Sequence, residues 1–453
     1  MVLLIVVLLV TVHIHIFTSL INKSPITGVL QNPNVHYDFT HMIAHDANTV
    51  IVGGTKFIHI VFARNLSIKI SRKIGPQIDN PNCISLQKRT APVERKNVST
   101  LELLPGLNQM SRAPIVANNS TATTVAFLAP GPKNSTAMYV GASWTNTRFR
   151  GIRSLVPAFS SRNIVDFDFT YASLITKPYT MVDSIYKDSF PIRYIYGFEL
   201  ENFSYIATVQ RQHVTAVEYV SKLIRVCQSD EKFYSYAERS LSCLYRGKSY
   251  NLLQTAHISK PGQNLARELG IPENEGVLFG MFGYGNPNDY SNKAEESVLC
   301  IFPNYYIKQV FTRNTRKCFQ GIGKTGPDHI VTPYYCQLTK INIGDDCCGE
   351  YDFNNPMDGP EPVSSTGVIS LDITASSLMV TTTSTGHNVA FVGTSSGKVK
   401  KIKIQTSSIL KEYDEVVVDV GIPIMKFIFD IDNQDTLYML TPKKVNEYRI
   451  QIC

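Results

Sequence analysis

Residues 389–404 decide the fold and read Val389-Ala-Phe-Val-Gly-Thr-Ser-Ser-Gly-Lys-Val-Lys-Lys-Ile-Lys-Ile404. An apolar run ends at Gly393, a short turn closes at Gly397, and lysines then alternate with Val or Ile. Apolar residues at every second position on both sides of a glycine turn predict a β-hairpin.

The same pattern recurs along the chain. Related stretches are Thr49–Thr55 running into Lys56–Val61, Met138–Trp144, and a more divergent copy at Asp435–Ile450. Hairpins spread over most of a chain favour radial repetition, in which four-stranded blades surround a channel and neighbours cover each other's faces. The alternative is a pair of β-sandwich domains, but no linker rich in Pro, Ser or charge divides the chain. One short helix is predicted at Asn264–Gly270, where Gly270 can end it.

Composition agrees with an all-β globular body. The chain has 453 residues, of which 43% are hydrophobic and 18% charged, so it can bury a large core. Its 23 Tyr and 22 Phe residues favour strands over helices. A net charge of +7 over 453 residues is mild and does not by itself indicate a nucleic-acid-binding protein.

The cysteines indicate an oxidising compartment. Seven of the nine fall between positions 227 and 348, and none form a C-x-x-C pair typical of metal sites. Their wide spacing predicts long-range disulfides in a secreted or cell-surface protein. These seven are Cys227, Cys243, Cys300, Cys318, Cys336, Cys347 and Cys348.

Two further features agree with export. The apolar run Val2–Phe17 predicts a signal peptide or N-terminal anchor over residues 1–21, unless the start of the chain is wrongly assigned. Sequons in the first half of the chain predict glycans on surface loops. Besides Asn22, the predicted sites are Asn65, Asn97, Asn118, Asn119, Asn134 and Asn202.

Motifs that would indicate nucleotide or acyl chemistry are incomplete. Cys318–Thr325 approaches a phosphate-binding loop, but Cys318 replaces its first glycine, so a disulfide-tethered loop is the better interpretation. Gly393–Gly397 spells a nucleophile elbow, yet a second strand follows instead of a helix. We therefore expect no enzyme.

Candidate metal and glycan sites are equally weak. His41 and His45 are four residues apart, the spacing of a metal-binding pair on a helix, but they lie in a strand-like stretch. Asp345 and Asp346 are interpreted as an acidic turn. We expect no metal and no cofactor. The basic strand Lys398–Lys403 indicates one solvated hairpin face, with sulfated-glycan binding as the alternative.

Several stretches are informative through their order and spacing: Ser160–Asn163, Tyr194–Phe198, Phe203–Tyr205, Tyr219–Cys227, Phe233–Cys243, Lys260–Ile271, Lys317–Gly321, Cys348–Gly349, Asn355–Gly359 and Val389–Ile404. Together they resemble the sema domain of plexins, the cell-surface receptors for semaphorins. The similarity covers most of residues 35–453 and implies a seven-bladed β-propeller over residues 31–452. Plexins carry further strands and cysteine pairs soon after the position of Cys83, whereas the stretch 96–112 of this chain is short and cysteine-free. This departure predicts an incomplete second blade.

The resemblance also implies cysteine pairing. The implied disulfides are Cys243–Cys300, Cys318–Cys336 and Cys227–Cys348. Cys453 would begin a truncated cysteine-rich module of the PSI type, whereas the pairing of Cys83 and Cys347 stays open.

The function that the resemblance implies is an extracellular semaphorin-binding receptor domain, acting in semaphorin–plexin signalling and in cell or axon guidance. Membrane association would then run through parts absent from this chain, and a homo-oligomer is allowed. The alternatives are a secreted semaphorin-like or decoy protein with the same propeller, and a propeller hydrolase, which would need clustered carboxylates. Localisation would be the outer face of the plasma membrane, or secreted.

The resemblance places ligand contacts roughly within residues 140–250. There a turn-like stretch carries Arg148, Phe149, Arg150 and Arg153, residue types that are frequent in binding hot spots. A solvated basic loop is the alternative.

Overall fold

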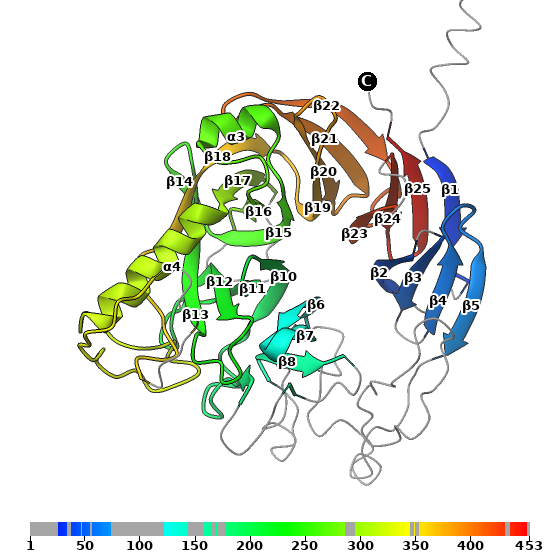
Figure 1. Ribbon diagram of the computed structural model, residues 1–453. Coiled ribbons are helices and arrows are strands. Elements are labelled where there is room, and N and C mark those ends of the chain that lie inside the picture. The colour runs from blue at the N-terminus through cyan, green and yellow to red at the C-terminus, as the bar shows by residue number, and fades with distance from the viewer. Residues whose placement is uncertain are drawn as a thin grey trace, which may run out of the picture. The chain divides into compact units, whose positions relative to one another are not determined.

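In the computed structural model about half of the described residues lie in strands, and nearly all of these strands run antiparallel to their neighbours (Figure 1). The described residues are 26–33, 38–46, 48–54, 57–73, 122–143, 157–164, 169–170, 177–285, 295–344, 348, 353–430 and 435–450. Several predicted features lie outside the described residues. They are the leader at 1–21, the stretch 96–112 of the predicted incomplete blade, Cys83 and Cys453. Among the described residues no helix combines the length and apolarity needed to cross a bilayer.

The chain divides into two units, residues 1–71 with 425–453 and residues 72–424. The first unit holds two four-stranded sheets. In one of them β1, from the N-terminal side, pairs with β25 near the C-terminus, so chain ends far apart in sequence share a sheet. The two sheets are β1(Ile26–Gln31)-β25(Lys444–Arg449)-β24(Thr436–Leu440)-β23(Lys426–Phe429) and β2(Phe39–Asp46)-β3(Thr49–Gly54)-β4(Phe57–Phe62)-β5(Ile68–Lys73).

The second unit contains four successive meanders of four strands each, counted over its described residues. The middle two join edge to edge, because β13 pairs in parallel with β18. The strands are β6(Thr124–Gly131), β7(Ser135–Ala142), β8(Phe159–Asn163), β9(Tyr179–Thr180); β10(Arg193–Leu200), β11(Phe203–Arg211), β12(Tyr219–Cys227), β13(Ala237–Tyr245); β15(Leu252–Ser259), β16(Val277–Gly283), β17(Ser297–Pro303), β18(Val363–Leu371); and β19(Ala375–Thr382), β20(Asn388–Thr394), β21(Lys398–Ile404), β22(Leu410–Val417). A short strand β14(Lys248–Tyr250) and a 3-10 turn η1(Pro132–Asn134) complete the set.

The hairpin predicted at residues 389–404 is present as β20 and β21. Gly397 has φ +84° in its turn, and an added Cβ would collide with the carbonyl of Asp419, so glycine is required there. The apolar residues of β20 are all buried, as are Val399, Ile402 and Ile404 of β21. The predicted β-rich fold of repeated hairpins is therefore confirmed.

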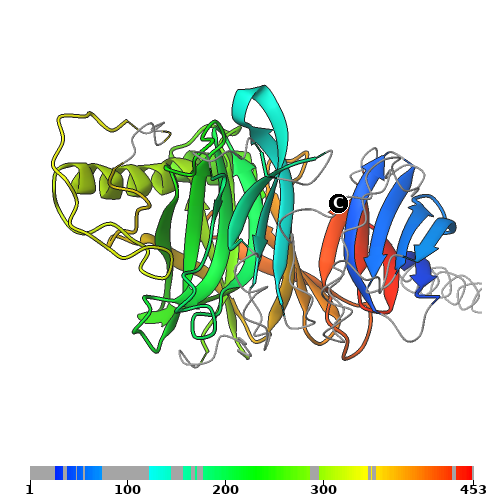
Figure 2. The same cartoon turned by 90° about the horizontal axis from the view of Figure 1, so that it is seen from below.

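The predicted short helix is α3(Gln263–Leu269), and Gly270 ends it in the left-handed conformation. A longer helix, α4(Asn304–Phe319), was not predicted. It buries Ile307, Val310 and Phe311 on one face, and this i, i+3, i+4 spacing is typical of an amphipathic helix. Figure 2 shows α4 and the chain after it projecting from the side of the strands of the second unit.

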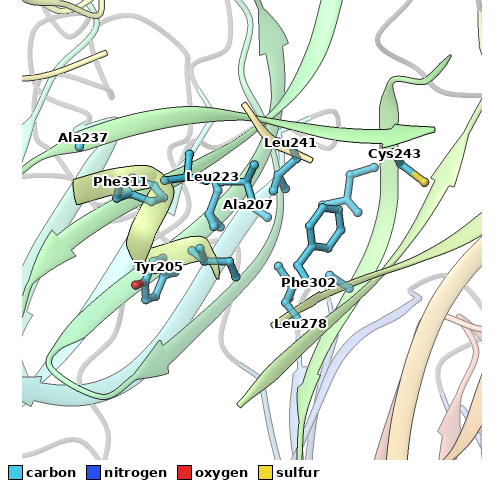
Figure 3. Close-up of a cluster of buried hydrophobic side chains, with 14 of the residues drawn as sticks. Tyr205, Ala207, Leu223, Ala237, Leu241, Cys243, Leu278, Phe302 and Phe311 are labelled. Carbon is cyan, nitrogen blue, oxygen red and sulfur yellow. The ribbon is translucent and has the colours of Figure 1, made fainter. Parts of the chain in front are cut away.

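Phe311 anchors α4 into the largest core cluster of the second unit (Figure 3). Its ring meets that of Tyr205 on β11 edge to face, with 6.2 Å between centroids. The guanidinium groups of Arg225 and Arg239 lie 4.5 and 5.2 Å from the Phe311 centroid. Aromatic and cation–π contacts in a buried site hold the helix against β12 and β13.

Candidate ligand-binding surface

A long segment between α4 and β18, residues 320–362, leaves its own sheet and packs on the neighbouring meander β10–β13. We call it the connecting segment. One disulfide, Cys318–Cys336, ties it to the end of α4, and a second, Cys227–Cys348, ties it to the end of β12. A third, Cys243–Cys300, joins β13 to β17. These are the three pairs that the resemblance implies.

A buried ion cluster fastens the far end of the connecting segment. The Nζ atom of Lys222 on β12 lies 3.1 Å from Glu238 Oε2 on β13 and 3.1 Å from Asp358 Oδ2 of the segment. The side chains of Lys222 and Glu238 are 1% and 0% exposed, so both charges depend on each other for neutralisation. Backbone bonds reinforce the contact, because Met357 accepts from Glu238 N–H and donates to the Tyr236 carbonyl.

The cluster keeps its charges despite burial. Burial alone would lower the pKa of Lys222, but the nearby Asp358 and Glu238 outweigh it and raise this pKa to about 12. Burial would likewise raise the pKa of Glu238, yet Lys222 reverses the effect and holds it well below its usual range. The pair is therefore ionised at neutral pH.

Glu238 has further buried partners. Tyr236 donates from its hydroxyl to Oε1 at 2.6 Å, and Gln210 donates from Nε2 to Oε2 at 2.8 Å. His329 of the connecting segment places Nε2 3.4 Å from Oε1 of Glu238. A carboxylate with this many partners fixes strand and segment in one arrangement.

The middle of the connecting segment forms hydrogen bonds to two turns of the chain, one before β10 and one between β11 and β12. The carbonyl of His329 accepts from Asp183 N–H at 2.7 Å, and the Asp328 carboxylate accepts from Val214 N–H at 3.1–3.2 Å. The His329 ring also stacks on Phe190, with 4.1 Å between centroids. We call residues 181–190 and 211–218 the rim turns.

Each rim turn exposes one large apolar side chain. Ile185 is 74% exposed and Val217 is 63% exposed. Apolar side chains on turns held by a buried network form a rigid surface that needs no catalytic group to recognise a protein. The rim turns lie within residues 140–250, where the resemblance places ligand contacts.

The predicted partner-binding residues Arg148, Phe149, Arg150 and Arg153 lie outside the described residues, as do the sequons at Asn97, Asn118 and Asn119. The other three sequon residues, Asn65, Asn134 and Asn202, are exposed at turns between paired strands. Asn65 Oδ1 accepts from Ser67 N–H at 3.1 Å and from Ser67 Oγ at 2.7 Å. These three side chains are accessible for modification.

The weaker motifs have structural explanations. Cys318–Thr325 forms the end of α4 and a loop held by the Cys318–Cys336 bond, and Gly393–Gly397 is the β20–β21 turn. His41 lies on β2, while the side chain of His45, together with Asp345, Asp346 and Cys347, lies outside the described residues. Within the described part of the chain, no group of three or more His, Cys, Asp or Glu could hold a metal.

The basic strand β21 is largely neutralised by its neighbour β22. The Nζ atom of Lys398 lies 2.7 Å from Oε1 of Glu415, and the Nζ atom of Lys400 lies 2.6 Å from Oε1 of Glu412. Lys401 pairs with Asp414 at 2.5 Å. Lysines engaged in this ladder are less available to a sulfated glycan, so the hairpin-face interpretation is favoured.

Sequence reasoning did not find the rim turns or the ion cluster. The stretch Asn355–Gly359 was recognised as part of the resemblance, but no spacing rule pairs Asp358 with Lys222, 136 positions away. Ile185 and Val217 carry no signal, since a single apolar residue in a loop is ordinary.

Comparison with known proteins agrees with the resemblance. The Sema domain family matches residues 253–424. Plexin-A3 of Rattus norvegicus is 30% identical over 328 residues, covering 68% of this chain and 17% of that protein. Plexin-A2 of Homo sapiens is 27% identical over 492 residues, covering 95% of this chain and 25% of that protein. The chain thus spans a quarter or less of the length of these relatives.

Solved structures share the fold. The plexin A4 extracellular region matches with a TM-score of 0.79 at 22% identity, over 92% of this chain and 46% of that chain. A chain of the Drosophila Plexin A complex with Semaphorin 1b matches with a TM-score of 0.53 at 13% identity, over 95% of this chain and 88% of that chain. The four-stranded sheets are accordingly blades of a β-propeller. The chain belongs to the sema-domain family, and its sema domain is of the plexin type.

Proposed function

We propose that this chain is the extracellular ligand-binding domain of a plexin-type receptor and that its ligand is a semaphorin. The observation that carries the proposal is the pair of rim turns, where Ile185 and Val217 are exposed on backbones held by Asp328 and His329. A preorganised apolar surface loses little entropy on binding a protein.

Semaphorin is the proposed partner because the matched Drosophila structure is a complex of Plexin A with Semaphorin 1b. An extracellular location is supported by three disulfides, which persist in oxidising compartments. Signalling across a membrane and cell or axon guidance would belong to a full receptor, of which this domain would supply recognition. Nothing in this role requires an active site.

Binding to a panel of purified semaphorin ectodomains tests the proposal. The chain, secreted from animal cells and captured on a biosensor, should bind at least one of them saturably. Ile185→Asp and Val217→Asp should each weaken that binding at least tenfold, because a desolvated carboxylate would face the ligand.

Val420→Asp is the matched control, since Val420 is 81% exposed but lies after β22 rather than on the rim. It should leave the affinity unchanged. Absence of binding to every ectodomain by the folded wild-type chain would contradict the proposed ligand. Equal affinities of the rim and control variants would place the site elsewhere.

A further inference from the structure

The connecting segment begins with a second exposed apolar feature, a two-stranded ribbon formed by residues 319–325 and 334–339. Its strands are joined by Thr325 N–H to the Tyr334 carbonyl at 2.8 Å and by Cys336 N–H to the Gly323 carbonyl at 3.1 Å. The Cys318–Cys336 disulfide closes it at the helix end. We call this element the ribbon.

The inner side of the ribbon is also held. Asn354, which is fully buried, accepts from Gln337 N–H at 2.7 Å and donates to the Gln337 carbonyl at 2.9 Å. Covalent and hydrogen-bond restraints on both strands therefore leave the backbone little freedom. Whatever the ribbon displays is presented in a defined geometry.

The ribbon exposes four large apolar side chains. Tyr335 is 77% exposed, Leu338 76%, Ile322 58% and Tyr334 38%. Single exposed apolar residues are ordinary, but four on one short rigid element are a feature of interaction surfaces. Tyrosine in particular is enriched among residues that dominate binding energy.

The charge of the ribbon is of one sign. Residues 319–325 and 334–339 contain Lys324 but no Asp or Glu, and Lys340 follows the second strand directly. Both lysines are exposed, and Lys324 Nζ lies 5.0 Å from the ring centre of Tyr335. An apolar patch bordered by lysines is complementary to an apolar patch bordered by carboxylates. The same charges would repel each other across a two-fold contact between two copies of the ribbon.

The ribbon is continuous with the rim turns. The loop that connects its two strands carries Asp328 and His329, the residues that bind the rim turns at Val214 and Asp183. Both apolar surfaces thus belong to one unit of the chain and are joined through a single hydrogen-bonded loop. A ligand that contacts both surfaces would span this loop.

We infer that the ribbon is a second part of the ligand-binding surface, and that it contacts an apolar region of the semaphorin bordered by acidic residues. The inference rests on the proposed function. It adds a site outside residues 140–250 and a stated chemistry for the ligand's complementary face.

The test uses the semaphorin ectodomain that binds the wild-type chain most tightly. Tyr335→Ala combined with Leu338→Ala should weaken binding at least tenfold, mainly through faster dissociation. The matched control combines Ile409→Ala with Val420→Ala, which truncates two exposed apolar residues in the turns on either side of β22, 55% and 81% exposed. Both double variants should unfold at the same temperature as the wild-type chain in a thermal melt, which shows that they are folded.

Charge is tested separately. Lys324→Glu should weaken binding and should reduce the dependence of the association rate on salt, because it removes attraction to the acidic border. Lys403→Glu, at an exposed lysine of β21, is its control and should do neither. A Lys324→Glu variant no weaker than its control would exclude the acidic border.

The outcomes separate the two proposals. If the wild-type chain binds and the ribbon variant binds equally well, the ribbon inference is wrong and the proposed function stands. If the wild-type chain binds no semaphorin, the proposed function fails and the inference fails with it. If the ribbon variant changes the sedimentation coefficient of the chain alone but not its affinity for the ligand, the ribbon serves contacts between copies, which also overturns the inference.

Discussion

The Oδ2 atom of Asp358 lies 3.1 Å from the Nζ atom of Lys222, although 136 positions separate the two residues in the chain. Lys222 sits on a buried strand and Asp358 at the end of the connecting segment. Their contact, shared with Glu238, holds that segment on a sheet to which it does not belong. The same segment carries Asp328 and His329, which bond the rim turns, and the second strand of the ribbon.

Lys222→Met should lower the free energy of unfolding by about 3–5 kcal/mol, because it leaves the buried carboxylate of Glu238 without its cation. Denaturant titration followed by circular dichroism measures the loss. Lys403→Met is the control at an exposed lysine and should change stability by less than about 0.5 kcal/mol. If Lys222→Met lowered the free energy of unfolding no more than Lys403→Met does, the ion cluster would add nothing to stability.

Acid should weaken the fold partly through Glu238. Its folded pKa lies well below 4.5, the ordinary value that applies when unfolded, so below that pH the unfolded chain binds a proton that the native chain does not. Stability from this group is therefore complete above about pH 4.5 and is lost as pH falls, at up to about 1.4 kcal/mol per pH unit. Glu238→Gln should show a shallower decline of unfolding free energy between pH 4.5 and 3 than the wild type. Parallel declines would contradict the assignment.

Removing the disulfide between β13 and β17 should be costly. Its loop spans 57 positions, and chain entropy alone gives about 4 kcal/mol for a loop of this length. Cys243→Ala combined with Cys300→Ala should thus reduce secretion and lower the unfolding midpoint in denaturant. Non-reducing peptide mapping of the wild type should recover the pair joined. Free thiols at both positions in secreted protein would contradict the structure and the oxidising compartment.

Glycans are expected on the exposed sequon residues. Asn65→Gln, Asn134→Gln and Asn202→Gln should each remove one glycan from protein secreted by animal cells, seen as a mass step that peptide N-glycosidase abolishes in the wild type. Asn264→Gln, at an asparagine outside any sequon, should leave the mass pattern unchanged. Fully unmodified secreted protein would show that these sites are not used.

The stretch Arg148–Arg153 remains a predicted contact. Replacing Arg148, Arg150 and Arg153 together by Glu should weaken semaphorin binding at least tenfold, about 1.4 kcal/mol, without unfolding the domain. Biosensor titration beside the Ile185→Asp variant would rank the two contributions. Unchanged affinity in a folded triple variant would leave this stretch as a solvated basic loop.

The sequence alone determined the hairpins and their repetition. In residues 389–404 the alternation of apolar and polar residues and the glycine turn act within a few residues of each other, so local pattern predicts them directly. The helix α3 and its glycine end are local in the same way. The cysteine pairs came from the resemblance rather than from spacing, since spacing allows many connectivities.

Only the tertiary structure decided which residues form the surface that we propose for a partner. The Lys222–Asp358 contact, the bonds from Asp328 and His329 to the rim turns, and the exposure of Ile185 and Tyr335 join residues that are distant in sequence. Burial of α4 through Phe311 likewise depends on aromatic and cationic groups from β11, β12 and β13. Such contacts form because a charge or ring taken out of water must find its partner wherever the folded chain supplies one, and no periodicity in the sequence records that meeting.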